Sequence, residues 1–374
     1  MLLFVLVLLV ACQAASHDVI PKGPVTQLEP VPKDSIRIVA LGTGTPDVRK
    51  AAVATSYLIQ LGNGENFLFD LGTGSYINLV ATGVPQDSLT KVFLSHLHSD
   101  HIADLASLYI GAMFGRTHAW EVWGPSGERP EFGTGAVIKG LSQFLAWDTH
   151  SRRKIDLIGR SDDGDKVIAH EFDYAAKNQV IYSRNGVTVT STPVDHYATA
   201  GPVALRLDWN GLSITYSGDT KPTQTLVDLA TRDKGTDVLL LQSMGPILDF
   251  AALPHNSQYL LNTSHITPTQ AGAVLQDISP RLAAVHHLTV NDASRVAIVS
   301  DIRTGYPASA LHIAEDLDVF EVSKDQIAIR KRLVPSTSWG YWHSDGEGVH
   351  AASGSGAAAM PFTRHSILAG LGLS

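Results

Sequence analysis

The sequence predicts an α/β fold with mixed β-sheets, and two observations lead to this prediction. Short apolar runs bounded by turn residues alternate along the chain with stretches whose apolar residues recur at helical spacing. Two of the runs, 203–209 and 212–217, are separated only by Asn210-Gly211, a dipeptide that accepts the positive φ angles of a type I′ turn. Because this hairpin is antiparallel while strands mixed with helices favour parallel pairs, mixed sheets are expected.

The remaining elements follow from the same patterns. Thr267-Pro268-Thr269-Gln270 places Thr at the N-cap, Pro at the first helical position and Gln at the third, which is a capping box that opens a helix through Ile278. Apolar spacing predicts three further helices, at 102–114, 223–231 and 293–303. The other predicted strands are 36–41, 56–61, 67–71, 92–95, 187–191, 238–241 and 282–286.

The chain is expected to form one folded domain at 35–334. Residues 17–34, which contain four prolines, are predicted to be an extended leader. Residues 115–180 are predicted to be an insertion between the two halves of the domain. The segment 335–374, rich in Gly, Ala and Ser, is predicted to be a low-complexity tail.

The N-terminal residues predict export. Residues 2–10 form an uninterrupted apolar run followed by small residues, which is typical of a signal peptide at 1–16 and is too short to span a bilayer. Leu9-Val10-Ala11-Cys12 also resembles a bacterial lipobox, in which Cys12 is lipidated after cleavage. We therefore expect a periplasmic or secreted protein that contacts a membrane only through an anchor at Cys12.

Charge and cysteine content exclude several kinds of site. The formal net charge is −8 and the longest basic run is 152–154, so no nucleic-acid partner is expected. The single cysteine excludes a disulfide framework and a thiolate metal site. Phe144, Trp147 and the basic run 152–154 lie in the predicted insertion, where they either roof a functional site or form a solvated loop over a small apolar cluster.

Four side chains able to bind metal lie in one short loop. The predicted strand 92–95 runs directly into His96-Leu97-His98-Ser99-Asp100-His101, after which a helix is predicted. In an extended stretch His96 and His98 point to the same side, and a turn at Ser99 lets Asp100 and His101 face a second position. Imidazole and carboxylate ligands without thiolate suit Zn²⁺, and also Mn²⁺ or Fe²⁺.

This HxHxDH loop resembles that of the metallo-β-lactamase superfamily, and the family's other motifs are present in order. The sequences LGTGTP at 41–46 and FDLG at 69–72 resemble the first motif as found in the ribonuclease Z and arylsulfatase-like branch. His196, Asp219 and His287 match the third-motif histidine, the bridging aspartate and the last histidine. The resemblance covers about residues 35–330 and implies a four-layer αββα sandwich of two mixed β-sheets.

Carried over residue by residue, the resemblance implies two metal sites joined by a bridging carboxylate. The ligands implied for the first ion are His96, His98 and His196. Those implied for the second ion are Asp100, His101 and His287, and Asp219 is the implied bridging residue. Two such ions about 3.5–4 Å apart share a hydroxide that is available at neutral pH and polarise the substrate oxygen. The expected reaction is therefore hydrolysis.

Three neighbouring residues keep two interpretations each. His286 is adjacent to His287 and is the alternative ligand, although the match of His-Leu-Thr to the family's His-Phe-Ser favours His287. Asp70 is expected to order a loop or to hold a ligand rather than to bind metal itself. Asp195 either orients a ligand imidazole or is a solvated loop residue.

His265 and Asp100 are the predicted catalytic residues. Ser264-His265-Ile266-Thr267-Pro268 resembles the His-Ser-Thr-Pro segment of the ribonuclease Z branch, in which the histidine protonates the leaving group. The alternative for His265 is a packing role at the helix start. A glutamate orients the histidine in that branch, and Gln242 stands in its place here, a neutral amide that does not stabilise an imidazolium as a charge does.

The sequence therefore predicts a dinuclear metal-dependent hydrolase of a small ester, with a phosphodiester or a sulfate ester expected from the branch resemblance. A lactonase or thioesterase on the same metal site is the alternative, because a carboxylic ester needs less acid assistance. The alternative from another class is a catalytically silent metal-binding protein.

Overall fold

The structure is a computed structural model of the chain, and it describes residues 18–47, 49–113, 116–154, 163–197, 200–245, 254–288, 292–307 and 310–334. The predicted signal peptide at 1–16, Cys12 and the predicted tail at 335–374 lie outside these residues. Among the helices of the described part, none is both long and apolar enough to cross a membrane.

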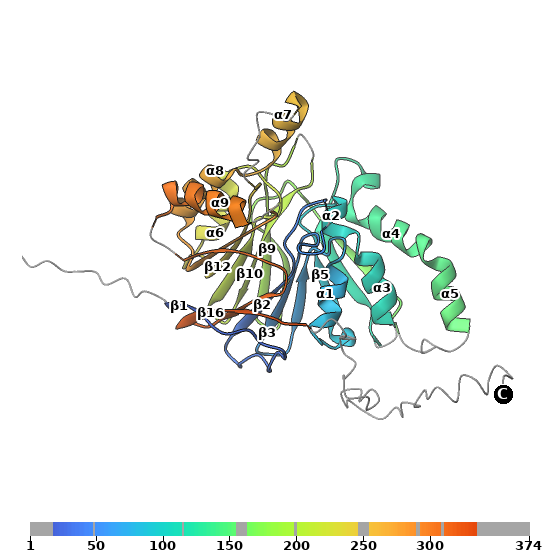
Figure 1. Cartoon of the computed structure of the whole chain (residues 1–374). Coiled ribbons are helices and arrows are strands. Elements are labelled where there is room, and N and C mark those ends of the chain that lie inside the picture. Colours follow the sequence, from blue (N-terminus) through green and yellow to red (C-terminus); the bar gives the residue numbers. More distant parts are fainter. Residues whose placement is uncertain are drawn as a thin grey trace, which may run out of the picture.

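Two mixed β-sheets form the centre of the molecule (Figure 1). The nine-stranded sheet has the order β1 (Asp18–Pro21), β16 (Gln326–Lys331), β15 (Asp318–Val322), β2 (Ile36–Gly42), β3 (Ser56–Leu61), β4 (Asn66–Phe69), β5 (Lys91–Phe93), β6 (Trp120–Pro125) and β7 (Val167–Phe172). The seven-stranded sheet has the order β14 (Leu311–Ile313), β13 (Leu282–His286), β12 (Val238–Gln242), β11 (Leu212–Tyr216), β10 (Val203–Trp209), β9 (Val187–Pro193) and β8 (Gln179–Arg184).

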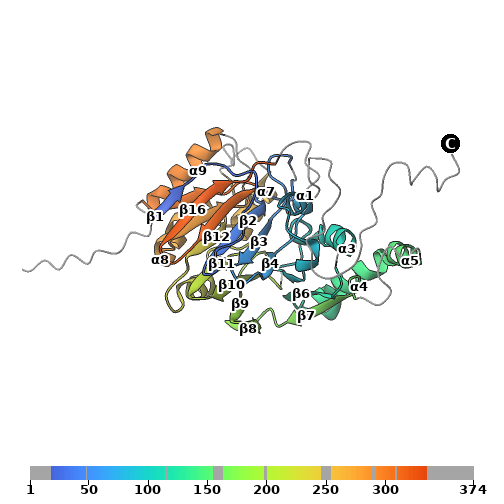
Figure 2. The same ribbon diagram turned by 90° about the horizontal axis from the view of Figure 1, so that it is seen from below.

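Helices cover the outer faces of both sheets (Figures 1 and 2). On the side of the nine-stranded sheet are α1 (Ser75–Ala81), α2 (Ser99–Ile102), α3 (Leu105–Met113), α4 (Thr134–Phe144) and α5 (Ala146–Lys154), with the short 3₁₀ turns η1 (Gln86–Ser88) and η2 (Pro130–Phe132). On the other side are α6 (Gln224–Thr231), α8 (Pro268–Ile278) and α9 (Asp292–Gly305). Helix α7 (His255–Ser264) protrudes at one end of the molecule.

Three apolar cores hold these layers together. The largest lies between the sheets and includes Ile38 and Phe69 from one sheet with Leu205 and Leu240 from the other. A second core joins the nine-stranded sheet to its helices, and a third joins the seven-stranded sheet to α6, α8 and α9. Each sheet is therefore covered by the other sheet on one face and by helices on the opposite face, which explains why its strands are apolar on both faces. This arrangement confirms the predicted four-layer αββα sandwich.

The local predictions match the structure closely where the pattern was strong. The hairpin of β10 and β11 turns at Asn210 and Gly211, whose φ angles are 52° and 77°. The capping box at Thr267 and Gln270 opens α8, with both of its hydrogen bonds present. The predicted helix at 102–114 is instead divided into α2 and α3, because the backbone N–H of Asp104 between them donates to the Leu71 carbonyl at 3.0 Å and not to a carbonyl of the preceding turn.

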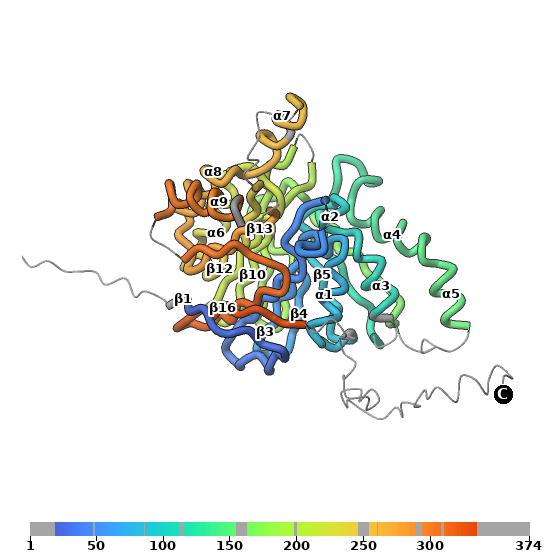
Figure 3. Tube along the Cα trace, in the orientation of Figure 1, coloured from blue at the N-terminus to red at the C-terminus, as the bar shows by residue number. Residues whose placement is uncertain are grey.

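Two predicted segment boundaries differ from the structure. The leader at 17–34 contributes β1, which pairs in parallel with β16, so the first and last strands of the described chain lie side by side (Figure 3). The predicted insertion at 115–180 contains β6 and β7, which belong to the nine-stranded sheet, so it is not a separate insertion; the described residues between these two strands are 126–154 and 163–166. Strand β7 was missed because it is the edge strand and only one of its residues is buried.

Candidate metal centre

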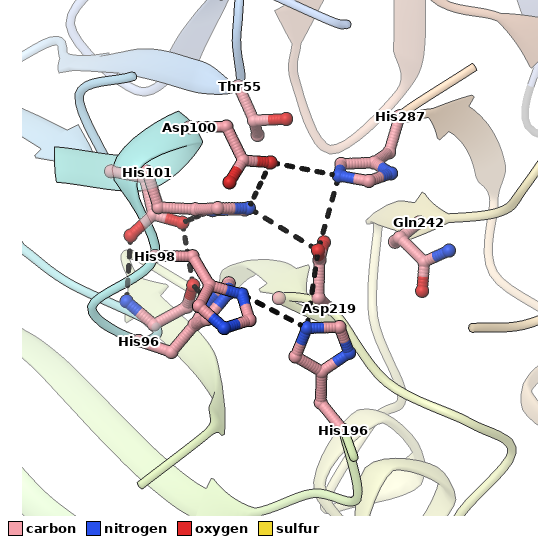
Figure 4. A network of polar contacts seen from close by, with 12 residues as sticks. Thr55, His96, His98, Asp100, His101, His196, Asp219, Gln242 and His287 are labelled. Atoms are coloured by element: carbon pink, nitrogen blue, oxygen red, sulfur yellow. Dashed lines mark hydrogen bonds and ion pairs between the residues drawn. The ribbon is translucent and has the colours of Figure 1, made fainter. Parts of the chain in front are cut away.

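Loops at the carboxyl ends of several strands meet at one end of the sandwich. Strands β11, β12 and β13 are parallel, and β9 runs in the same direction because β10 is antiparallel to both β9 and β11. The residues after these strands therefore gather at one sheet edge, where they meet the loop after β5 of the other sheet. All seven residues that the sequence proposes as metal ligands lie together there (Figure 4).

The first cluster contains His96, His98 and His196. Nδ1 of His98 lies 3.1 Å from Nε2 of His96 and 3.2 Å from Nε2 of His196. His96 and His98 sit in the extended loop after β5, and His98 is the N-cap residue of α2. Three ring nitrogens thus converge on one position, although they come from segments about a hundred residues apart, as the separation of 98 between His98 and His196 shows.

The second cluster contains Asp100, His101, Asp219 and His287. Oδ2 of Asp219 lies 3.1 Å from Nε2 of His287 and 3.5 Å from Nε2 of His101. Oδ2 of Asp100 lies 3.3 Å from Nε2 of His287 and 3.4 Å from Nε2 of His101. Because Oδ2 of Asp219 is also 3.9 Å from Nε2 of His196, this carboxylate lies between the two clusters.

The spacing and burial of these groups fit divalent metal ions. Ligand atoms about 2.1 Å from a tetrahedral zinc ion lie about 3.4 Å from one another, which is close to the separations in both clusters. Among the described residues, Nε2 of His101 and Oδ1 of Asp219 are buried and have no hydrogen-bond partner. A buried lone pair without a donor is costly, and a metal ion at either position would satisfy it.

Electrostatics divide the imidazoles into two groups. Burial lowers the pKa of His96, His98 and His196, so these rings are neutral and carry the free lone pairs that a metal needs. Burial also lowers the pKa of His287, but the charge of Asp219 and contacts with Asp100 and Asp219 outweigh it and raise the pKa to about 9. In the metal-free protein His287 therefore holds a proton that a metal ion displaces.

Contacts behind the clusters fix the direction of the ligand rings. Nδ1 of His101 lies 2.7 Å from Oδ2 of Asp70, which also accepts hydrogen bonds from the hydroxyls of Ser95 and Tyr216, each at 2.6 Å. Asp70 thus holds a ligand, one of the roles expected for it. Ser95 and Tyr216 were not singled out from the sequence, although each stands one to three residues from a metal motif.

Backbone groups hold two of the other proposed ligands, His196 and His287. Nδ1 of His196 lies 2.8 Å from the Ser264 carbonyl oxygen. The backbone N–H of His287, which has a φ of 62°, donates to the Thr43 carbonyl at 2.7 Å. Thr43 is in turn held by the carboxylate of Asp316, which accepts from its N–H and from its hydroxyl. Asp316 lies 273 residues from Thr43 in the sequence, so no local pattern indicated it.

The structure distinguishes between the interpretations left open for two residues. His286 belongs to β13 and is fully buried between the sheets against Tyr57 and Tyr216, whereas the ring of His287 faces Asp100 and Asp219. Asp195 does not contact a ligand ring, since its carboxylate pairs with Nζ of Lys221 at 2.8 Å.

His265 lies against the metal clusters, but without the partner expected for it. Its ring centroid is 4.9 Å from that of His196 and 5.2 Å from that of His287. Gln242 uses Oε1 to accept a hydrogen bond from the Thr220 N–H, and no described residue bonds to Nδ1 of His265. Burial lowers the pKa of His265 to about 3, so its imidazole is neutral at pH 7.

The predicted insertion contacts this end of the molecule through its first residues only. A cavity of about 230 Å³ beside His96, His98 and His196 is walled in part by Pro125, Glu128 and Phe132. Phe144 and Trp147 are 78% and 80% exposed and do not line the cavity. Figures 1 and 2 place α5 at the outer edge of the molecule, so of the two interpretations given for Phe144 and Trp147 the structure supports the solvated position and not the roof.

Comparison with known proteins places the chain in a family. Residues 65–288 match the family model described as a β-lactamase superfamily domain. Ribonuclease Z from Mycobacterium sp. (strain KMS) is 31% identical over 209 residues, which are 52% of this chain and 65% of that protein. The ribonuclease Z of Mycobacterium marinum is 29% identical over 199 residues, or 52% of this chain and 67% of that protein.

Solved structures show the same fold. The metallo-β-lactamase fold protein YhfI from Bacillus subtilis has a TM-score of 0.55 at 18% identity, covering 77% of this chain and 100% of that one. The short form of human tRNase Z has a TM-score of 0.55 at 16% identity, covering 76% and 98%. Because the family model spans more than half of the sequence, this chain belongs to the β-lactamase superfamily and has the metallo-β-lactamase fold.

Proposed function

We propose that this protein is a metal-dependent hydrolase that cleaves a small ester with two divalent ions. Zinc is the first candidate, and Mn²⁺ or Fe²⁺ suits the same donors. The observation that carries the proposal is the position of Asp219, whose Oδ2 is within 3.1 Å of His287, 3.5 Å of His101 and 3.9 Å of His196. One carboxylate between two clusters is the arrangement that a pair of neighbouring ions requires.

The residues of the centre are proposed to have three roles: binding the ions, orienting water and contacting the leaving group. When bound, the two ions acidify water for attack and polarise the substrate oxygen. His96, His98 and His196 would hold one ion, and Asp100, His101 and His287 would hold the other. Asp100 also presents its carboxylate beside His287 and His101, where it can orient the attacking water. His265, against the rings of His196 and His287, is placed to hydrogen-bond the leaving group.

Two ester classes remain as candidates for the substrate. Similarity to proteins named ribonuclease Z favours a phosphodiester, and a sulfate ester presents the same anionic tetrahedral group. One observation favours a carboxylic ester or thioester. Gln242 accepts a hydrogen bond from Thr220 and gives His265 no charged partner, and these esters need less acid assistance from His265. The formal charge of −8 and the cavity of about 230 Å³ support a small molecule over a nucleic acid.

Export to the periplasm or beyond the cell is part of the proposal. It rests on the apolar run at 2–10 and on the residues around Cys12. Mass spectrometry of the protein recovered from cells would identify the mature N-terminus and any lipid on Cys12. Recovery of the intact chain from the cytoplasm would contradict it.

The test is a set of initial rates with the purified, metal-analysed protein. The substrates are chromogenic phosphodiester, phosphomonoester, aryl sulfate, lactone, thioester and β-lactam compounds, with an RNA oligonucleotide beside them. We expect one ester class to be hydrolysed and the rate to vanish with chelator and return with Zn²⁺ or Mn²⁺. Cleavage of the RNA alone would contradict the small-ester proposal.

Asp219→Ala is the decisive variant, and Asp195→Ala is its matched control. Loss of the bridging carboxylate is expected to lower kcat/KM by at least about 100-fold, and to lower the metal content. Asp195 lies in the same layer of loops but pairs with Lys221, so its removal should leave both unchanged. An unimpaired Asp219→Ala enzyme would rule out the assignment. Full metal content without turnover on any substrate would instead support the silent metal-binding protein.

A further inference from the structure

The cavity beside the first metal cluster has walls from two segments outside the metal motifs. It measures about 230 Å³ and opens against His96, His98 and His196. One wall comes from the segment 125–132, which follows β6, and another from 200–202, which precedes β10. A group bound at the metal centre therefore has room to extend in this direction, but only a small group fits, because drug-sized ligands occupy about 300–1,000 Å³.

The wall that follows β6 is held in place by its own backbone. The N–H of Ser126 donates to the Phe172 carbonyl at 2.7 Å, and the N–H of Phe132 donates to the Arg129 carbonyl at 2.9 Å. A Cβ added at Gly127 would lie 2.6 Å from the carbonyl carbon of Phe132, so the turn closes too tightly for any larger residue. The backbone of this turn thus places Glu128 and Phe132 beside the cavity, and both side chains are partly exposed at its rim.

The chemistry of the walls is apolar with one negative charge. Leu97, Pro125 and Phe132 present apolar surface to the cavity. Among the described lining residues, Glu128 is the only one with a charged side chain apart from the histidines, and no hydrogen bond or ion pair holds its carboxylate. The nearest cation in sequence, Arg129, is not in the lining, since it stacks 4.3 Å above the Phe132 ring and pairs with Glu131 at 3.2 Å.

We propose that this cavity holds an apolar substituent of the substrate that ends in a positively charged group, and that Glu128 selects for that charge. The inference rests on the proposed function, because it places the reacting ester at the metal centre. Apolar walls favour the alkyl part of the substituent through the hydrophobic effect. An unpaired carboxylate at the mouth attracts a cationic end and repels a carboxylate or phosphate end.

The test measures binding and does not require turnover. Three alkyl hydroxamates of equal chain length carry the same metal-binding group and end in a methyl, a carboxylate or a trimethylammonium group. Their dissociation constants for the zinc-loaded protein are measured by isothermal titration calorimetry at low salt. We expect the cationic compound to bind about tenfold more tightly than the neutral one, and the anionic compound to bind more weakly by about the same factor.

Substitutions test whether Glu128 and Phe132 cause this order of dissociation constants. Glu128→Gln should bring the three dissociation constants together, and Glu128→Lys should reverse their order. Phe132→Ala should weaken all three by a similar factor, since it removes apolar wall without removing charge. Glu131→Gln is the matched control, because Glu131 belongs to the same turn but pairs with Arg129 outside the cavity, and it should keep the order of the wild type.

Three outcomes would overturn the proposal. One is an unchanged order of affinities in Glu128→Gln. Another is failure of all three hydroxamates to bind a protein shown to contain zinc, which would separate the cavity from the metal centre. Hydrolysis of esters without any charge order would refute this inference and leave the proposed function standing. A charge order in a zinc-loaded protein that hydrolyses no ester would refute the proposed function and leave only a cavity that prefers cationic ligands.

Discussion

Oδ2 of Asp70 lies 2.7 Å from Nδ1 of His101, the ring nitrogen that faces away from the metal clusters. Both side chains are fully buried, and Asp70 has a left-handed backbone with a φ of 54°. The contact determines which nitrogen His101 turns to the centre, because Nδ1 donates to the carboxylate and Nε2 is left facing Asp100 and Asp219. Asp70 thus orients the ring of His101, which we propose as a metal ligand.

Asp70→Asn is expected to lower metal affinity by about 10- to 100-fold without unfolding the protein. The amide keeps the shape of the carboxylate but loses the charge that orients the His101 ring. Competition with a fluorescent zinc chelator measures the affinity. Tyr216→Phe removes one hydrogen bond to the same carboxylate and should have a smaller effect. Equal affinities for wild type and Asp70→Asn would contradict this role.

Zinc affinity is expected to rise with pH up to about 9. In the metal-free protein the pKa of His287 is about 9 and the carboxylates of Asp219 and Asp70 also raise the pKa of His101, so below pH 9 a zinc ion must displace protons from this cluster, and each unit of pH lost weakens apparent affinity by at least about tenfold. The stability of the metal-free protein should move in the opposite direction. A raised pKa stabilises the fold fully below the ordinary value of 6.5, and this contribution is lost as pH rises through 9.

Both trends are measured on one preparation, zinc affinity by competition and stability by urea denaturation of the chelated protein between pH 6.5 and 9. His287→Gln should flatten the stability trend over that range, since the titrating ring is gone. A zinc affinity independent of pH below 9 would show that no proton is displaced from the centre.

His265→Ala is expected to affect substrates according to their leaving groups. A neutral imidazole with a pKa of about 3 donates a hydrogen bond but is a weak general acid at neutral pH. Esters of para-nitrophenol should lose less than about tenfold in kcat/KM, whereas the corresponding alkyl esters should lose about 100-fold or more. Equal losses for both leaving groups, with unchanged metal content, would indicate a packing role at the start of α8.

Gly211→Ala is expected to destabilise the protein by about 1–2 kcal/mol and to leave kcat/KM unchanged. Gly211 has a φ of 77° in the hairpin between β10 and β11, and an added Cβ would meet only the end of the Lys324 side chain at 3.8 Å. The cost is therefore backbone strain alone. Urea denaturation measures it, with Gly23→Ala as the control, since Gly23 has ordinary φ and open space. Equal stabilities would contradict the turn assignment.

Local patterns in the sequence are enough to predict the features that depend on a few neighbouring residues. Asn210-Gly211 predicts its hairpin and Thr267 its helix start, because turn and cap preferences act over a few residues. The run from His96 to His101 indicates metal chemistry because strand and turn geometry place its side chains on two sides of one loop. The other ligands were found through motif resemblance, since nothing in the vicinity of His196 or Asp219 distinguishes them from ordinary loop residues.

Contacts between side chains of distant segments can be read only from the tertiary structure. Tyr216 and Asp70 are 146 residues apart and bond at 2.6 Å, and Thr43 and Asp316 are 273 residues apart. Gln242 likewise accepts a hydrogen bond from Thr220 and, among the described residues, forms none with His265, which the sequence alone did not indicate. Such contacts depend on the packing of one sheet against the other, which brings loop ends together by burying apolar faces, and the apolar pattern does not specify which polar atoms then touch.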